Sequence, residues 1–309
     1  MPNEVALSVR NTLTGILPPL AMPFDDDSKL VADAIGPQID MMVGAGVRGV
    51  VAGGSTGEGH TLSHSEFVTA MTEAHSATAG RVPFVAGLIV NSTRDAIERV
   101  EMLGDIKIDA LQVTPVYYLF KTSLKATIKH FREIWEATQI PILIYNVIPW
   151  NYLSVDDMIT IMDEVPGVVG MKQSSGDLKS VTDLLLRAKP ENLVLSGIDA
   201  LLYPAFSMGA HGAISALTCA VPGTTVTMFD AVQRGDDAVA RDLHFKLNAL
   251  WNAMPHDQLP ACVKYVQSRQ GLPLFHPRAP MEKVDADRQR LIDAALDPVL
   301  EATEAARAA

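Results

Sequence analysis

The chain has little cysteine: only Cys219 and Cys262 occur among its 309 residues. Two cysteines in a chain of this length make no disulfide framework, and neither lies in a C-x-x-C or zinc-binding spacing, so we expect a protein of the reducing cytoplasm. The sequence also has no run of about 18 uncharged apolar residues, which argues against a membrane-spanning helix. Its first 15 residues lack an apolar segment behind a basic start, and no secretory signal peptide is expected there.

Basic residues are in deficit as well. The 25 Lys and Arg are outnumbered by 36 Asp and Glu, which gives a formal net charge of −11. This balance argues against nucleic-acid or anionic-membrane partners, whose binding depends on clustered positive charge, although a small anionic ligand in a local pocket remains compatible with it. Hydrophobic residues, in contrast, make up 48% of the chain, enough for a large core.

Short apolar runs alternate with amphipathic segments along most of the chain. Several runs, such as PILIYNV, are apolar on both faces, as in parallel strands that are covered on both sides. The segments between them start with helix-capping signals at Ser63, Thr93, Ser123 and Ser154. Eight strand–helix units predict an α/β fold, a (β/α)8 TIM barrel with a C-terminal helical extension. The eight runs cover residues 16–24, 47–52, 83–88, 110–114, 141–147, 168–172, 193–196 and 212–216.

Two regions are expected from this pattern. Residues 1–220 would form the barrel with the catalytic site, and residues 221–309 a helical region packed on it. The Ala-rich end, ATEAARAA, is expected to fray. In such barrels the chemistry lies at the carboxyl ends of the strands, which directs attention to the residues found there.

The second run ends in the glycine-rich segment GGSTGEG, residues 53–59. Its glycines allow the backbone to approach a ligand closely, and the hydroxyls of Ser55 and Thr56, with free N–H groups nearby, suit a carboxylate. Gly54 belongs to the same candidate site. The alternative is a plain glycine-rich turn that leads into a helix.

The fifth and sixth runs end near Tyr145 and Lys172. A lysine inside a barrel is costly to desolvate unless it is paired or neutral, and the neutral amine is a nucleophile. The alternatives are a lysine that extends past the strand end to solvent and a tyrosine that serves only the core. Tyr117 and Tyr118 follow the fourth run, where surface packing is the competing explanation. Together, these groups are what Schiff-base chemistry with a 2-oxo acid needs. The amine would attack the keto carbon, the phenol would transfer protons, and the hydroxyl-rich loop would hold the carboxylate.

These residues resemble a known family, the dihydrodipicolinate synthase and N-acetylneuraminate lyase family of pyruvate-dependent class I aldolases. The resemblance extends over nearly the whole chain, into the C-terminal helices at Lys264, Gly271 and residues 278–280. Its strongest elements are GSTGE and GMKQSSGDL in their correct order. The other matching segments are LPPLAMPF, VTPVYY, YNVIP, LSGID and HGAIS.

The resemblance implies a role for each matched residue. Lys172 would form the Schiff base, and Tyr145 would relay protons to and from the imine and the acceptor oxygen. Ser55 and Thr56 would contact the carboxylate of pyruvate, and the carbonyl of Ile214 would face it. Tyr117, or Tyr118 in its place, would enter the neighbouring subunit's site. The family implies no metal and no organic cofactor, small-molecule 2-oxo acid and aldehyde substrates, and a homotetramer built as a dimer of dimers.

Two departures concern the acceptor. The synthase branch has an Arg two residues after the proline of its Tyr-Asn-x-Pro segment, whereas Asn151 stands there in this chain, behind Trp150. The lyase branch has an Asp-Glu pair where this chain has Asp199 followed by Ala200. We therefore expect an acceptor that is neither aspartate semialdehyde nor N-acetylmannosamine, bound in a more apolar pocket with Asp199 and Trp150. The apolar lining would come from Leu119, Phe120, Trp150 and Tyr152.

Other functions remain open at this point. The same Schiff-base site could serve a 2-keto-3-deoxy sugar acid dehydratase or a hydratase-aldolase. Residues 53–57 also fit the G-x-S-x-G pattern of a serine hydrolase that would use Ser55, with Asp199 and either His211 or His256. A non-catalytic sugar-acid binder on the same barrel is a third possibility, which the presence of both Lys172 and Tyr145 disfavours.

Overall fold

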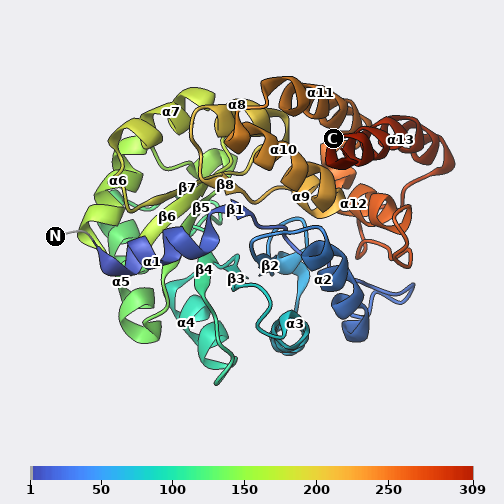
Figure 1. Cartoon of the computed structure of the whole chain (residues 1–309). Coiled ribbons are helices and arrows are strands. Elements are labelled where there is room, and N and C mark those ends of the chain that lie inside the picture. Colours follow the sequence, from blue (N-terminus) through green and yellow to red (C-terminus); the bar gives the residue numbers. More distant parts are fainter. Residues whose placement is uncertain (1–2, 309) are drawn as a thin grey trace.

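Eight parallel strands form one sheet in the order β1-β8-β7-β6-β5-β4-β3-β2 in the computed structural model, which describes residues 3–308 (Figure 1). The segment just after β1 meets β2 through a parallel bridge between Pro19 and Val51, with Leu20 N donating to Val51 O at 2.8 Å. This bridge closes the sheet into a ring and confirms the predicted barrel. The strands are β1 (Gly15–Ile16), β2 (Val50–Ala52), β3 (Phe84–Leu88), β4 (Ala110–Val113), β5 (Ile142–Asn146), β6 (Val168–Gln173), β7 (Leu193–Ser196) and β8 (Gly212–Ala213).

Helices cover the outside of the ring, as the alternation of the sequence predicts. Ser63, Ser123 and Ser154 cap their helices with side-chain oxygens, whereas the fourth helix is capped by Ser92, one residue before the expected Thr93. The covering helices are α2 (Ile35–Gly44), α3 (His64–Thr78), α4 (Thr93–Glu101), α5 (Leu124–Thr138), α6 (Val155–Glu164), α7 (Leu178–Arg187) and α8 (Leu202–Ser207). Short 3-10 turns lie at Ala32–Ala34, Gly59–Thr61, Pro149–Asn151, Asp199–Leu201 and His256–Gln258.

One helix was not expected from the sequence. Helix α1 (Glu4–Leu13) lies across the strands in Figure 1, and its apolar side chains Ala6, Val9 and Leu13 share one buried cluster with residues of the barrel interior. Several of these interior residues, such as Ala110 and Leu193, stand at the first position of their strands. Helix α1 therefore closes the amino end of the barrel, opposite the end where the chemistry was expected.

The chain is helical after β8: α9 (Ala216–Ala220), α10 (Pro222–Arg234), α11 (Asp237–Ala253), α12 (Leu259–Ser268) and α13 (Ala286–Ala308). The expectation that the Ala-rich end frays is wrong for residues 302–308, and residue 309 lies outside the described residues. Thr303 is buried and its hydroxyl lies 2.7 Å from that of Thr224 on α10, while Arg307 Nε donates to Thr227 Oγ1 at 3.0 Å. These contacts come from residues about 80 positions away, so the tail composition could not reveal them.

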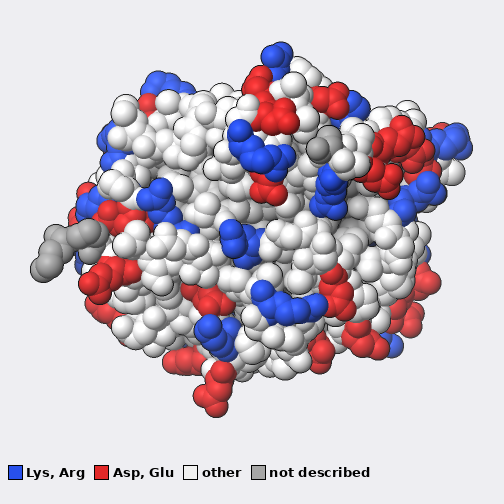
Figure 2. All heavy atoms as spheres, in the orientation of Figure 1, with Lys and Arg blue, Asp and Glu red and all other residues white. Residues whose placement is uncertain are grey.

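Charged side chains of both signs are interspersed over the face shown in Figure 2. Within residues 3–308, no helix combines the length and apolarity needed to cross a bilayer. Cys219 and Cys262 are both buried and free.

Candidate active site

Lys172 and Tyr145 are neighbours across two strands. They are register partners of β6 and β5, and Lys172 Nζ lies 4.0 Å from the centroid of the Tyr145 ring. Tyr145 Oη donates a hydrogen bond to Ser55 Oγ at 3.1 Å. Lys172 and Tyr145 are 5% and 3% exposed. The fold thus brings three predicted site residues, from three different strand ends, into one contiguous group.

The space around the lysine depends on Gly197, which directly follows β7. A Cβ at this position would lie 3.0 Å from Lys172 Cε and 2.1 Å from Ser174 Oγ. Any side chain there would therefore displace the lysine or the serine. Ser174 Oγ is buried and has no hydrogen-bond partner, so an unpaired hydroxyl lies near the Lys172 side chain at the carboxyl end of β6.

The loop that carries Ser55 and Thr56 folds back on itself between β2 and α3. Gly57 N donates to Gly54 O at 3.1 Å, and Glu58 adopts a left-handed conformation with φ of 54°. A Cβ on Gly59 would meet Gly53 O at 2.1 Å, which explains why this segment needs glycine. The turn leaves Ser55 and Thr56 half-buried, with Ser55 directed at the Tyr145 phenol.

A buried ion pair anchors this loop, which sequence reasoning missed although Glu58 lies inside the GSTGE motif. Lys264 Nζ of α12 lies 2.5 Å from Glu58 Oε1, and Arg278 N donates to Glu58 Oε2 at 2.8 Å. Lys264 also donates to His276 O at 2.9 Å. Burial lowers the pKa of Lys264, and the charge of Glu58 opposes that shift. The C-terminal helices therefore hold the loop next to the Schiff-base candidate.

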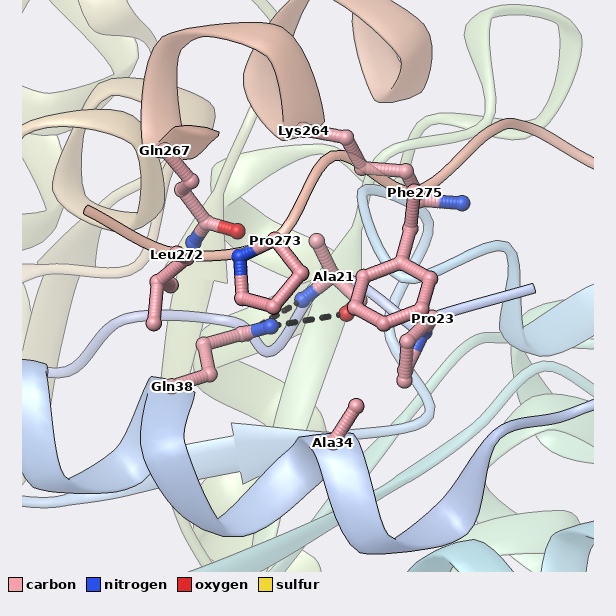
Figure 3. A pocket seen from close by; sticks show the side chains of 9 residues that line it. All are labelled: Ala21, Pro23, Ala34, Gln38, Lys264, Gln267, Leu272, Pro273 and Phe275. Atoms are coloured by element: carbon pink, nitrogen blue, oxygen red, sulfur yellow. Dashed lines mark hydrogen bonds between the residues drawn. The ribbon is translucent and has the colours of Figure 1, made fainter. Parts of the chain in front are cut away.

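Lys264 also borders a small cavity between α12 and α2, shown in Figure 3. Its volume of about 10 Å³ matches a single water molecule. Gln38 lies on its wall with its amide hydrogen-bonded to Ala21. This cavity is too small for an organic ligand.

Asp199 has a different setting from the one expected of a sugar-binding residue. It is buried and accepts hydrogen bonds from Leu217 N at 2.6 Å and Ala216 N at 3.4 Å, at the amino end of α9. Burial raises the pKa of its carboxyl group, and the charge of Lys172 opposes this shift. Both carboxylate oxygens thus accept from backbone N–H groups, the closer contact being the one to Leu217.

The loops after β4 and β5 are tied to each other. Trp150 Nε1 donates to Tyr117 O at 2.9 Å, and Asn151 Nδ2 donates to Val116 O at 2.6 Å. Trp150 is nevertheless 64% exposed, so its indole lies at the surface of the loops. Tyr152 reaches inward instead, with its hydroxyl donating to Ser174 O at 3.3 Å. Burial is the main reason that the pKa of Tyr152 is raised.

Tyr118, Leu119 and Phe120 continue the exposed apolar surface of the β4–α5 loop, each about 70% exposed.

Ile214 directly follows β8 and is fully buried, and its N–H donates to Ser196 O at 3.0 Å. Among residues 3–308, no group of three or more His, Cys, Asp or Glu side chains is arranged to hold a metal ion.

His211, one of the two candidate histidines of the hydrolase triad, lies at the wrong end of the barrel. His211 immediately precedes β8, and its Nδ1 accepts a hydrogen bond from Val194 N near the start of β7 at 2.9 Å. Ser55 follows the carboxyl end of β2. A Ser55–His211 pair is therefore not assembled, and Asp199 is committed to capping α9.

Comparison with known proteins agrees with this geometry. A sequence model of the dihydrodipicolinate synthetase family matches residues 12–298. The 4-hydroxy-tetrahydrodipicolinate synthase of Methanopyrus kandleri is 33% identical over 284 residues, which cover 91% of this chain and 94% of that protein. The chain belongs to the dihydrodipicolinate synthetase family, whose members are pyruvate-dependent class I aldolases and lyases that use a lysine Schiff base.

Solved structures extend the comparison. A prophage protein of E. coli K12 from the same family, solved in complex with pyruvate, is 25% identical with a TM-score of 0.87, over 92% of this chain and 98% of that chain. The wild-type sialic acid aldolase of Ruminococcus gnavus has the same fold, with a TM-score of 0.87 at 21% identity, over 95% and 99% of the two chains. Membership of the family, shown by the sequence model and the Methanopyrus kandleri relative, makes the protein a lyase of the class I aldolase type, as the sequence predicted.

Proposed function

We propose that the protein forms a Schiff base between Lys172 Nζ and the keto carbon of pyruvate or a related 2-oxo acid, and condenses the acid with an aldehyde or cleaves the corresponding product. The observation that carries this proposal is the contiguous group of Lys172, Tyr145 and Ser55 at the carboxyl end of the barrel. The pyruvate complex of the related E. coli prophage protein supports pyruvate as the first substrate.

Each residue of the group has a step in this mechanism. The neutral amine of Lys172 adds to the C2 carbonyl, and the carbinolamine loses water as Tyr145 transfers protons. The resulting iminium acidifies the neighbouring C–H bond, and transfer of that proton to the Tyr145 relay gives an enamine. The enamine then attacks the aldehyde carbon, and the aldehyde oxygen takes the proton back from Tyr145. Water adds to the product iminium, and the carbinolamine breaks down to the free product and the Lys172 amine. Because the Tyr145 ring faces the lysine nitrogen, it also stabilises the iminium charge.

The carboxylate of the 2-oxo acid would bind to the loop between β2 and α3. Gly54, Ser55 and Thr56 would supply N–H and hydroxyl donors, and Ile214 would offer its carbonyl from the end of β8, which β1 alone separates from β2. Ser55 has a second task, because its bond to Tyr145 holds the phenol in position for proton transfer. Thr56 supports the same alignment.

The acceptor is, in this proposal, neither aspartate semialdehyde nor N-acetylmannosamine. Asn151 replaces the expected arginine, and its amide is used to hold Val116 O. Asp199 is used to cap α9. The remaining side chains of these loops are mainly apolar, which favours an apolar or aromatic aldehyde. A panel of aldehydes tested with pyruvate checks this, and aspartate semialdehyde as the best acceptor would refute it.

Two observations favour a second candidate, a synthase whose acceptor is aspartate semialdehyde. The relative from Methanopyrus kandleri is named a 4-hydroxy-tetrahydrodipicolinate synthase, which is the synthase branch of the family. Lys121 brings a positive charge to the β4–α5 loop, where its Nζ donates to Tyr152 O at 3.5 Å. In this case Lys121→Ala would raise the KM for aspartate semialdehyde selectively. A dehydratase or hydratase-aldolase reaction on the same Schiff base is the third outcome that product analysis would distinguish.

The proposal includes the assembly and the division of the chain. Residues 1–220 would form the catalytic barrel, residues 221–309 its packed helical region, and four cytoplasmic copies a dimer of dimers. The exposed Tyr118, Leu119 and Phe120 support a covering subunit, into whose site Tyr117 or Tyr118 would reach. Light scattering would give the mass of the assembly, and Tyr117→Phe compared with Tyr118→Phe would show which phenol matters.

The direct test is chemical trapping. Incubation with pyruvate and borohydride, followed by digestion and mass analysis, should give an adduct on Lys172 with the mass of pyruvic acid less one oxygen. Lys264 is the internal control, because it is equally buried but paired with Glu58. An adduct on another lysine would contradict the assignment, and so would the absence of any adduct after repetition with longer 2-oxo acids.

A further inference from the structure

Gln112 on β4 has a buried amide group without a hydrogen-bond partner. The residue is 0% exposed, and neither its Oε1 nor its Nε2 is paired within the protein. A buried amide normally has partners, because the loss of its bonds to water is unfavourable unless they are replaced. This side chain therefore needs an explanation other than core packing.

The other buried glutamines of residues 3–308 show what a structural amide looks like. Gln38 accepts from Ala21 N at 2.8 Å and donates to Ala21 O at 2.9 Å, as Figure 3 shows. Gln173 accepts from Ser175 N at 3.1 Å, and Gln267 donates to Cys219 O at 3.0 Å. Gln112 differs from all three.

The direction of the side chain follows from the alternation of strand residues. Ala110 of β4 and Leu143 of β5 belong to the cluster that fills the barrel interior. Residues two positions further along each strand point the same way, which places Gln112 and Tyr145 on the inner face. Because Gln112 is the register partner of Leu143, it lies one layer deeper than Tyr145.

The amide lies beneath the loop that holds Ser55. A Cβ built on Gly54 would stand 3.7 Å from Gln112 Nε2. The unpaired amide is thus next to the proposed carboxylate-binding loop, on the side of the barrel interior.

We propose that Gln112 is a further substrate-binding residue, whose amide forms the polar floor of the site and hydrogen-bonds an oxygen of the bound 2-oxo acid, directly or through one water. This inference rests on the function proposed above. The bound acid would supply the hydrogen-bond partner that the Gln112 amide lacks within the protein. This hydrogen bond would lie on the side of the acid away from the aldehyde.

The test compares two substitutions of the same kind, Gln112→Met and Gln38→Met. For each variant, urea denaturation without ligand gives the folding midpoint, and borohydride trapping gives the pyruvate concentration for half-maximal labelling of Lys172. Gln112→Met should keep or raise the midpoint, since it removes an unpaired polar group, and should raise the half-maximal concentration about tenfold or more. Gln38→Met should lower the midpoint and leave the labelling unchanged.

The outcomes separate this inference from the proposed function. Normal labelling of Gln112→Met at wild-type pyruvate concentrations overturns the role of Gln112, whatever its stability. If Gln112→Met does not fold, Gln112→Leu replaces it, and failure of both shows that the amide is structural. If the wild-type protein gives no adduct with any 2-oxo acid, the proposed function fails and this inference fails with it.

Discussion

Glu58 and Lys264 form a buried ion pair across 206 positions of the sequence, with Nζ 2.5 Å from Oε1. The pair joins the strained loop beside the Schiff-base candidate to α12, in the C-terminal helical region. Arg278 adds a backbone hydrogen bond to the second carboxylate oxygen. The helices after the barrel thus take part in shaping the site, although their own residues do not include the candidate nucleophile.

Replacement of Glu58 by Gln should destabilise the protein by about 3–5 kcal/mol, because it leaves the Lys264 charge buried without its counterion. Urea denaturation measures the effect. Glu58→Gln combined with Lys264→Met should recover much of the loss. Asp26→Asn is the matched control: it breaks an exposed pair with Lys283 and should leave the denaturation midpoint unchanged. A Glu58→Gln protein as stable as wild type would show that the pair does not hold the loop.

Replacement of Lys172 by Met should abolish turnover and pyruvate labelling while raising the free energy of unfolding by about 1 kcal/mol. The stability gain is expected because a buried amine is exchanged for an apolar side chain of similar length. Steady-state kinetics and thermal denaturation check the two halves. Lys179→Ala, at an exposed position of α7, is the control for loss of a lysine. Near-wild-type turnover in Lys172→Met would refute the assignment.

Replacement of Tyr145 by Phe should lower kcat by about 10²–10⁴-fold, since it removes the group proposed to relay protons. Labelling of Lys172 by pyruvate and borohydride should persist, but more slowly, because the amine and its surroundings remain. Time courses of labelling, quenched at successive intervals, give the rate of Schiff-base formation separately from kcat. Tyr203→Phe makes the same chemical change on α8, and should leave both rates unaltered. Equal rates in Tyr145→Phe and wild type would assign the proton transfer elsewhere.

His130 should make folding stability fall below neutral pH. Burial lowers the pKa of its imidazole to about 4 in the folded protein, from an ordinary value of 6.5. As the pH falls from about 6.5 to about 4, His130 therefore binds a proton in the unfolded chain but stays neutral in the folded protein. This difference lowers the free energy of unfolding by on the order of 3 kcal/mol across that window. Above pH 6.5 the residue is neutral in both states and the effect vanishes.

Urea denaturation between pH 4 and pH 7.5 tests this, with His130→Gln expected to flatten the slope in the acid half. The exposed His256 offers the control substitution His256→Gln, which should preserve the wild-type slope. An unchanged slope in His130→Gln would place the acid sensitivity in other groups.

Much of this architecture is predictable from the sequence, because its causes are local or periodic. Two-sided apolar runs identify the strands, and serines at helix starts identify most caps. Once the barrel is predicted, residues at strand ends fall together by geometry, so Lys172, Tyr145 and Ser55 could be selected before the structure.

The rest depends on partners distant in the sequence. The sequence around Glu58 does not indicate that Lys264 is its partner. Gln112 is the single polar residue of the apolar run ALQV, which does not indicate a role in binding. Helix α1 was missed because its apolar residues Val5, Leu7 and Val9 alternate as in a strand. Its position depends on the apolar side chains at the amino end of the barrel, which it covers and which come from distant parts of the sequence. The C-terminal tail docks through Thr224 and Thr227, which its own composition cannot show.

Helix α1 also marks a division of labour between the two ends of the barrel. It covers the amino end, so the carboxyl end, where Lys172, Tyr145 and Ser55 meet, is the end left for substrates. In the proposed condensation, the 2-oxo acid must be joined to Lys172 before an enamine exists to attack the aldehyde. In the proposed cleavage, the aldehyde leaves while the acid is still joined to the lysine. One end of the barrel thus serves stability and the other a reaction whose order is fixed by its covalent intermediate.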